Sequence, residues 1–141
     1  MITFDPPENV GGIEARAIGY SRRLSELGIF VEIVALAPNY GFSEEKTEAC
    51  LIRRYPSGVR DIPRVFRAIA REISADSIDS IFLLSGGLTL LGQLVLMYAR
   101  LVGVRSTLLF YGKDILVAKR SISRVFLYTA PLVTSRVAVN S

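Results

Sequence analysis

Hydrophobic residues along this chain gather in short continuous runs, separated by longer stretches in which apolar and polar positions recur with a helical period. The short runs are rich in β-branched residues, which is typical of strands buried on both faces of a sheet. They predict strands at residues 1–4, 30–36, 51–55, 81–84, 106–110 and 137–139. Residues 38–41, Pro-Asn-Tyr-Gly, predict a turn.

The longer stretches predict helices. Residues 13–27 gather apolar side chains near one face, and Gly28 follows as a helix terminator. The most regular stripe runs from Ile62 to Ile73, where apolar residues recur at helical spacing. Residues 88–102 are apolar nearly all round and are therefore expected to be buried. Further helices are expected to start near 115–117 and over 125–132.

Strands that alternate with helices predict an α/β fold: a single Rossmann-like domain with a mostly parallel sheet and helices on both faces. In such sheets, ligands bind outside the carboxyl ends of the strands. The segments that follow each strand are therefore the first candidates for a site. They are residues 5–12, 37–41, 85–88, 111–114 and 140–141.

Length and composition narrow the class of protein. The chain has 141 residues, enough for one domain with a real core, and its mean hydropathy is +0.39. Residues 81–99 carry no charge, but Ser85-Gly86-Gly87 interrupts them, so a buried strand and a buried helix are expected rather than a membrane span. The net charge of +4 fits an anionic partner such as a membrane surface, a phosphorylated ligand or nucleic acid.

Missing residue types exclude several chemistries. The chain has no histidine and one cysteine, Cys50, which excludes Ser-His-Asp catalysis, an internal disulfide and a cysteine-based zinc cluster. The first residues have neither a basic region nor a long apolar stretch, so we expect no signal peptide and a cytoplasmic location.

The first loop is the strongest candidate for ligand binding. Gly11 and Gly12 precede a helix, where exposed N–H groups and the helix dipole favour an anion such as a diphosphate. An ordinary strand-to-helix turn explains the same residues equally well. The loop lacks G-x-G-x-x-G, no acidic residue ends the second strand, and no Gly-Lys-Ser/Thr is present, which disfavours a nicotinamide-dependent oxidoreductase and excludes a P-loop.

This opening resembles the amino-terminal signature of family 4 glycosyltransferases. Pro-Pro, a short spacer, Gly-Gly-Ile-Glu, a helix that ends in Leu-Ser-Glu-Leu-Gly and a strand that reads Val-Glu-Ile-Val appear in that order. Residues 110–114, Phe-Tyr-Gly-Lys-Asp, stand where the family carries His-Gly-x-Asp, and residues 137–141 resemble the strand that leads to the interdomain crossover. The resemblance covers nearly the whole chain and implies the amino-terminal, acceptor-side half of a GT-B fold, with the nucleotide-binding half absent from residues 1–141.

The resemblance also implies roles for individual residues. Donor or acceptor contacts fall on the glycine-rich loop, on the segment after the fourth strand and on the segment after the fifth. These residues are Gly11, Gly12, Glu14, Ser85, Gly86, Tyr111, Lys113 and Asp114. Tyr111 replaces the family's histidine and cannot become a cation at neutral pH. Glu14 can equally be an acid that stabilises a helix start, Ser85-Gly86 a tight turn, and Lys113 with Asp114 a solvated pair.

A row of arginines recurs opposite the apolar stripe of residues 62–73. Arg60, Arg64, Arg67 and Arg71 are spaced to share one helix face, which predicts either docking on an anionic membrane or a solvated outer surface. Nucleic-acid binding is disfavoured, because no aromatic residues interleave with them.

The expected function is therefore transfer of a sugar, with retention, from a nucleoside diphosphate sugar to a glycan or lipid-linked acceptor, as the resemblance implies. No cofactor, metal or catalytic base is expected in this chain, which alone should lack measurable transferase activity. The missing carboxyl-terminal domain is the expected partner, with peripheral contact at the cytoplasmic face of the membrane. The alternative is a non-catalytic flavodoxin-like or Rossmann-like binding module.

Overall fold

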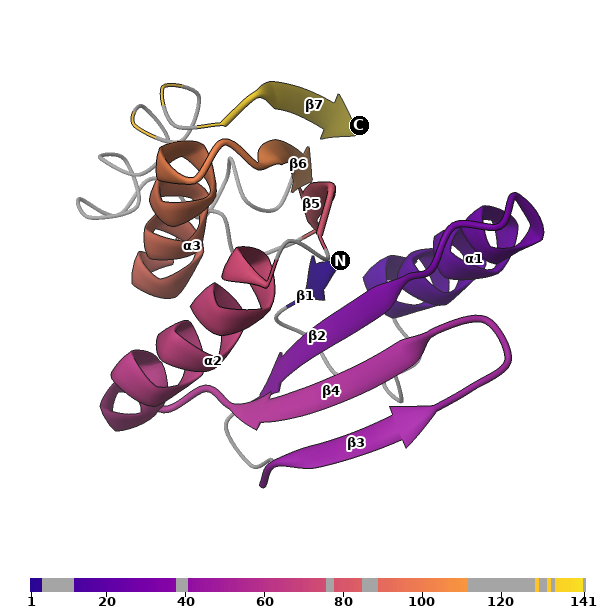
Figure 1. Ribbon diagram of the computed structural model, residues 1–141, viewed down its shortest axis with the longest axis horizontal. Coiled ribbons are helices and arrows are strands. Elements are labelled where there is room, and N and C mark those ends of the chain that lie inside the picture. The colour runs from indigo at the N-terminus through magenta and orange to yellow at the C-terminus, as the bar shows by residue number, and fades with distance from the viewer. Residues whose placement is uncertain are drawn as a thin grey trace. The chain divides into compact units, whose positions relative to one another are not determined.

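The computed structural model describes residues 1–3, 12–37, 41–75, 78–84, 89–111, 129, 132 and 134–140. The chain is an α/β protein that has a small mixed sheet and a parallel sheet. Its elements are β1 (Ile2–Thr3), α1 (Gly12–Glu26), β2 (Glu32–Ala37), β3 (Ser43–Lys46), β4 (Leu51–Pro56), a 3-10 turn (Val59–Asp61), α2 (Ile62–Ser74), β5 (Ser80–Leu83), α3 (Leu90–Leu101), β6 (Arg105–Tyr111) and β7 (Arg136–Asn140). They form two compact units, Met1–Ile62 and Pro63–Ser141 (Figure 1).

β2 is the central strand of the first unit, Met1–Ile62. It pairs in parallel with β1 and with β4 (Figure 1). Val34 lies opposite both Ile2 and Arg53. The side chains of residues 33–36 are buried, which confirms the predicted continuous apolar strand. The strand predicted at 51–55 is also confirmed, as β4.

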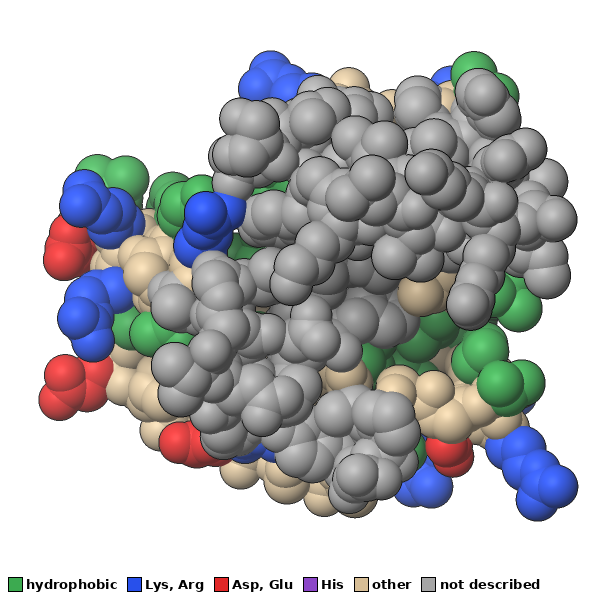
Figure 2. All heavy atoms as spheres, turned by 180° about the vertical axis from the view of Figure 1, so that it is seen from behind, with side chains coloured by type: hydrophobic (Ala, Val, Ile, Leu, Met, Phe, Trp, Pro, Cys, Tyr) green, Lys and Arg blue, Asp and Glu red, His purple; other side chains and the backbone are tan. Residues whose placement is uncertain are grey.

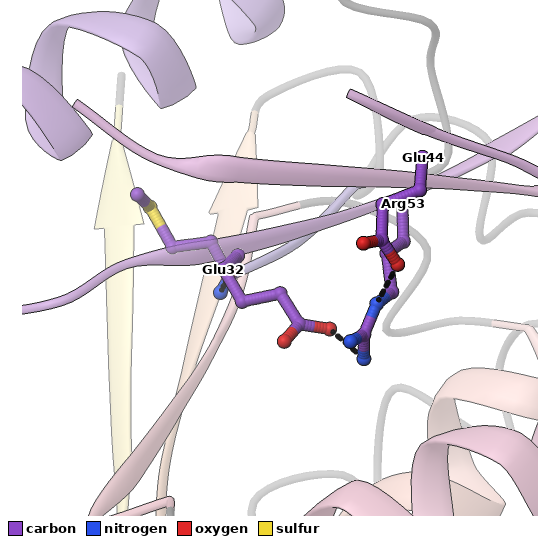
Figure 3. Close-up of polar contacts among 4 residues, drawn as sticks. Glu32, Glu44 and Arg53 are labelled. Carbon is purple, nitrogen blue, oxygen red and sulfur yellow. Dashed lines mark hydrogen bonds and ion pairs between the residues drawn. The ribbon is translucent and has the colours of Figure 1, made fainter. Parts of the chain in front are cut away.

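β3 is a strand that the hydrophobic pattern did not predict. It pairs antiparallel to β4, and all four of its side chains are exposed. Ion pairs to two consecutive arginines of β4 hold it. Arg53 Nε lies 2.9 Å from Glu44 Oε2, and Arg54 Nη2 lies 2.8 Å from Glu45 Oε2. The Arg53 guanidinium also reaches Glu32 of β2 at 3.0 Å, so one side chain ties three strands together (Figure 3).

α1 ends in a glycine-dependent cap. Gly28 has a φ of 75°, the Gly28 N–H donates to the Ser25 carbonyl, and the Ile29 N–H donates to the Leu24 carbonyl. These two bonds satisfy carbonyls that the helix end would leave unpaired. The predicted terminator is confirmed. α3 ends in the same way at Gly103, whose φ is 80°.

A pair of glycine substitutions tests this account of the α1 cap. We expect Gly28→Ala to lower the free energy of unfolding by about 1 kcal/mol, because alanine is strained at positive φ. Gly19 lies within α1, and a Cβ atom at either glycine meets no heavy atom within 4 Å. Gly19→Ala should therefore raise the free energy of unfolding by about 0.5–1 kcal/mol. Urea denaturation of both variants measures the contrast, and a shift of the same sign in both would contradict it.

The second unit, Pro63–Ser141, contains a parallel sheet in the order β5-β6-β7. α2 buries Val65, Ile69 and Ile73, which confirms the predicted apolar stripe. α2 begins at Ile62 after the 3-10 turn, so the expectation that four arginines share one helix face is wrong for Arg60, which lies in that turn. The turn begins after Gly58, whose φ of −64° and ψ of 151° are not helical.

α3 is not buried all round, contrary to the expectation for residues 88–102. It begins at Leu90, because the Thr89 hydroxyl caps it by accepting a 3.1 Å hydrogen bond from the Gly92 N–H. One face is buried, but Leu90, Met97 and Leu101 are exposed. An apolar pattern on every side of a helix does not indicate which side the sheet covers.

Residues 81–99 divide into β5 and α3, as predicted. No helix within the described residues combines the length and the hydropathy that crossing a membrane requires. The strands predicted at 106–110 and 137–139 are confirmed as β6 and β7. The helix expected near 115–117 lies outside the described residues, whereas Thr129 and Leu132, in the stretch expected to be helical, are helical.

Candidate functional site

The first candidate site, in the unit Met1–Ile62, is the junction between β1 and α1. β1 ends at Thr3, and α1 begins at Gly12, so Gly12 is the first residue of the helix and Glu14 lies in its first turn. Gly11 lies outside the described residues. The first N–H groups of a helix have no partner within it and carry partial positive charge. The structure therefore places a helix N-terminus after the first strand, as the glycine pattern predicted.

The second candidate site lies at the carboxyl ends of the strands in the unit Pro63–Ser141. Tyr111 is the last residue of β6, and its register partner Asn140 is the last residue of β7. The parallel pairing therefore brings the ends of these two strands together at one edge. β5 ends at Leu83, opposite Leu108. Ser85, Gly86, Lys113 and Asp114, which follow β5 and β6 in the sequence, lie outside the described residues.

Three of the four arginines predicted to share a helix face do so in the structure. Arg64, Arg67 and Arg71 lie on α2, opposite its buried face, and all three are exposed. Arg60 is exposed as well, but it lies in the 3-10 turn. Within the described part of the chain, no ion pair is formed by any of these four guanidinium groups. A concentration of unpaired positive charge is thus available on one face of α2.

A surface depression lies at the opposite edge of the second sheet from Tyr111 and Asn140. Its volume is about 400 Å³, and it is lined by the carboxyl-terminal ends of α2 and α3 and by the residues that precede β5 and β6. Ser74 and Asp79 contribute polar side chains to its lining, which also includes Gly103. The sequence pattern did not point to this depression, since it follows from two helices that end side by side. No group of three or more acidic, cysteine or histidine residues that could hold a metal ion occurs in the described ranges.

The amine of Met1 is a buried titratable group at the amino end of β1. It donates a hydrogen bond to the backbone carbonyl of Glu32. Burial lowers its pKa from 8.0 to about 6, and the charge of the nearby Glu32 carboxylate opposes this shift in part. Because the amine bonds to the backbone of β2, its protonation bears on the stability of the pairing between β1 and β2.

Comparisons with known proteins do not assign the chain to a family, because no family model, curated protein or solved structure matches it. The site therefore rests on the fold and on the residues themselves.

The buried amine predicts how stability depends on pH. The unfolded chain binds a proton at this amine below about pH 8, whereas the folded chain does so below about pH 6. Because the unfolded state holds more protons between these values, the free energy of unfolding should rise by about 2–3 kcal/mol as the pH increases from 6 to 8. Urea denaturation at several pH values, with a free amino terminus, measures this slope.

Glu32→Gln is the control for this prediction. It removes the carboxylate that raises the pKa of the amine, so the rise in stability should begin at a lower pH than in the parent chain. A stability that does not change between pH 6 and pH 8 would show that the amine is not buried as described.

Proposed function

We propose that this chain is the amino-terminal, acceptor-side domain of a retaining family 4 glycosyltransferase, in which both units belong to one Rossmann-like domain of a GT-B fold. The observation that supports this best is positional. Gly12 of the Gly-Gly-Ile-Glu segment opens α1 after β1, and Tyr111 of the Phe-Tyr-Gly-Lys-Asp segment ends β6. The first segment therefore stands at the start of the helix that follows a strand, and the second begins at the carboxyl end of a strand; α/β proteins bind ligands at both kinds of position.

In this proposal the chain binds and orients substrates. The N–H groups at the start of α1 face the diphosphate of a nucleoside diphosphate sugar. A helix N-terminus stabilises a nearby negative charge by about 0.3–1 kcal/mol at an exposed site and by up to about 2 kcal/mol at a partly buried one. Sugar transfer requires stabilisation of the departing diphosphate, and preorganised N–H donors provide it without reorganisation.

Residues near the end of β6 would contact the sugar or the acceptor. Tyr111 offers a hydroxyl that donates or accepts a hydrogen bond, and Lys113 and Asp114 offer polar groups for sugar hydroxyls. A second domain would hold the nucleotide. This division of roles requires no metal or catalytic base from the 141 residues, which alone should bind the donor weakly and transfer no sugar.

The runner-up function is a non-catalytic Rossmann-like binding module. One observation favours it: α3 exposes a stripe of large apolar side chains, as an interaction surface does. Such a module would bind through its helices and would not need the strand ends.

Ligand-detected NMR with nucleoside diphosphate sugars tests the proposal. We expect weak binding that Gly12→Val reduces at least about tenfold, because a β-branched side chain at the helix start blocks the approach of the diphosphate. Asp114→Ala should weaken binding about fivefold by removing a hydrogen bond to a sugar hydroxyl, which is worth about 1 kcal/mol.

Gly19→Val is the matched control, since Gly19 lies in the middle of the same helix and is exposed. It should leave donor binding unchanged. Equal losses in both glycine variants would indicate damage to α1 rather than a blocked site. Robust sugar transfer by the 141-residue chain alone would contradict the assignment of this chain to half of an active site.

A further inference from the structure

α3 carries an apolar stripe that faces solvent. Leu90, Met97 and Leu101 are 51%, 49% and 81% exposed, and Leu94 between them is half-buried. Their spacing places all four on one face of the helix. The opposite face of α3 is buried. Exposed apolar side chains that form a continuous stripe mark a surface that is covered by a partner.

α2 lies beside α3 in the same unit (Figure 1). Tyr98 of α3 joins them, since its ring packs edge-on against Phe66 with 5.8 Å between centroids and its hydroxyl lies 2.5 Å from Ser74 Oγ. Phe66 and Ser74 lie on one flank of α2, and Arg64, Arg67 and Arg71 lie on the outer side, away from buried Ile69. The apolar stripe of α3 and the arginine row of α2 are therefore neighbours.

Charge is divided unevenly between the two units. Pro63–Ser141 contains ten lysines and arginines against four acidic residues, whereas Met1–Ile62 contains seven against nine. The acid of α2, Glu72, is half-buried and already has an interaction partner. Along the left margin of the face in Figure 2, basic and acidic side chains alternate among the described residues visible there. Positive charge beside the α3 stripe is thus not offset on α2.

We propose that the surface formed by Leu90, Met97 and Leu101 of α3 and by Arg64, Arg67 and Arg71 of α2 docks on an anionic lipid bilayer. The apolar side chains enter the boundary between headgroups and acyl chains, and the guanidinium groups bind lipid phosphates. This surface is distinct from the strand-end site, so the inference does not depend on the proposed function.

The chemistry of the surface favours lipid over other occupants. An apolar stripe flanked by cations is the arrangement that interfacial helices use, because it matches both the depth and the charge of an anionic leaflet. Single-stranded nucleic acid would need exposed aromatic platforms, but Phe66 is packed against Tyr98. A second copy of the chain would bring two surpluses of positive charge together.

Flotation with lipid vesicles tests the proposal. The 141-residue chain is mixed with vesicles of phosphatidylcholine alone, or of about 70% phosphatidylcholine and about 30% phosphatidylglycerol, which provides the anionic surface. We expect binding to the anionic vesicles that weakens as salt is raised. The triple variant Arg64→Gln/Arg67→Gln/Arg71→Gln should bind roughly a hundredfold more weakly, since each cation contributes about 1 kcal/mol.

The control for charge is Arg22→Gln/Arg23→Gln/Lys46→Gln, which removes three exposed cations from the first unit. It changes net charge by the same amount and should reduce binding by less than about fivefold if the α2 row makes the contact. Equal losses in the two triple variants would overturn the assignment of the surface.

The apolar stripe is tested separately. Met97→Ser/Leu101→Ser should weaken binding by about tenfold or more, also at high salt. The matched control is Leu27→Ser/Phe30→Ser, since Leu27 and Phe30 are 74% and 73% exposed and lie in the first unit. If this control loses vesicle binding and Met97→Ser/Leu101→Ser keeps it, the turn between α1 and β2 contacts the bilayer and the proposal is overturned.

Two further results would overturn the proposal. One is the absence of binding to anionic vesicles by the parent chain. The other is a dimer, detected by sedimentation, that Met97→Ser/Leu101→Ser dissociates while vesicle binding is unchanged, because the stripe would then be an interface between copies.

Discussion

Parallel strands cannot be joined by a tight turn, and both units of this protein are organised by that constraint. Each return to a parallel neighbour needs a crossover segment, so loops and helix starts accumulate at the carboxyl ends of the strands. In the first unit this arrangement places the start of α1 after β1. In the second it places the ends of β6 and β7, Tyr111 and Asn140, next to each other. In each unit, the position of the candidate site follows from this connectivity rather than from any single side chain.

The antiparallel strand β3 is the exception, and side-chain charge explains it. Its residues, Ser-Glu-Glu-Lys, have low strand propensity and bury nothing. Arg53 and Arg54 of β4 point to opposite faces of the sheet, and each pairs with a glutamate of β3. Exposed pairs of this kind contribute about 0.2–1 kcal/mol each, which supports an edge strand but does not replace a core. The charges also protect an exposed sheet edge from pairing with other chains.

Local pattern predicted the elements whose burial follows from their own sequence. The regular stripe of α2 and the continuous apolar run of β2 correspond to buried residues in the structure. The pattern failed where long-range contacts decide. β3 exists because of partners on β4, which a periodicity cannot reveal. The exposure of Met97 and Leu101 depends on which side of α3 meets the sheet, and an all-round apolar helix carries no signal for that. The depression beside Asp79 requires the ends of two helices to lie near each other.

The positions of Gly12 and Tyr111 in the fold were predictable from the sequence. Glycine at the start of a helix after a strand pointed to the α1 N-terminus, and the end of β6 followed from the same reasoning about parallel sheets. The alternatives for Glu14, Lys113 and Asp114 depend on side-chain environments that a one-dimensional pattern does not contain. The sequence pattern also placed Arg60 on the helix, whereas it lies in the 3-10 turn that precedes α2. Arg60 lies four residues before Arg64, as on a helix, but the backbone is extended at Gly58 and forms a 3-10 turn before α2 begins at Ile62.

The central claim, that ligands bind at the carboxyl ends of the strands, is tested most directly by locating the contact itself. Amide hydrogen exchange would be followed residue by residue in the presence and absence of saturating nucleoside diphosphate sugar. The account predicts slower exchange in the first turn of α1, beginning at Gly12, and around Tyr111 at the end of β6. Protection confined to Ser74, Asp79 and Gly103, at the opposite edge of the second sheet, would contradict it.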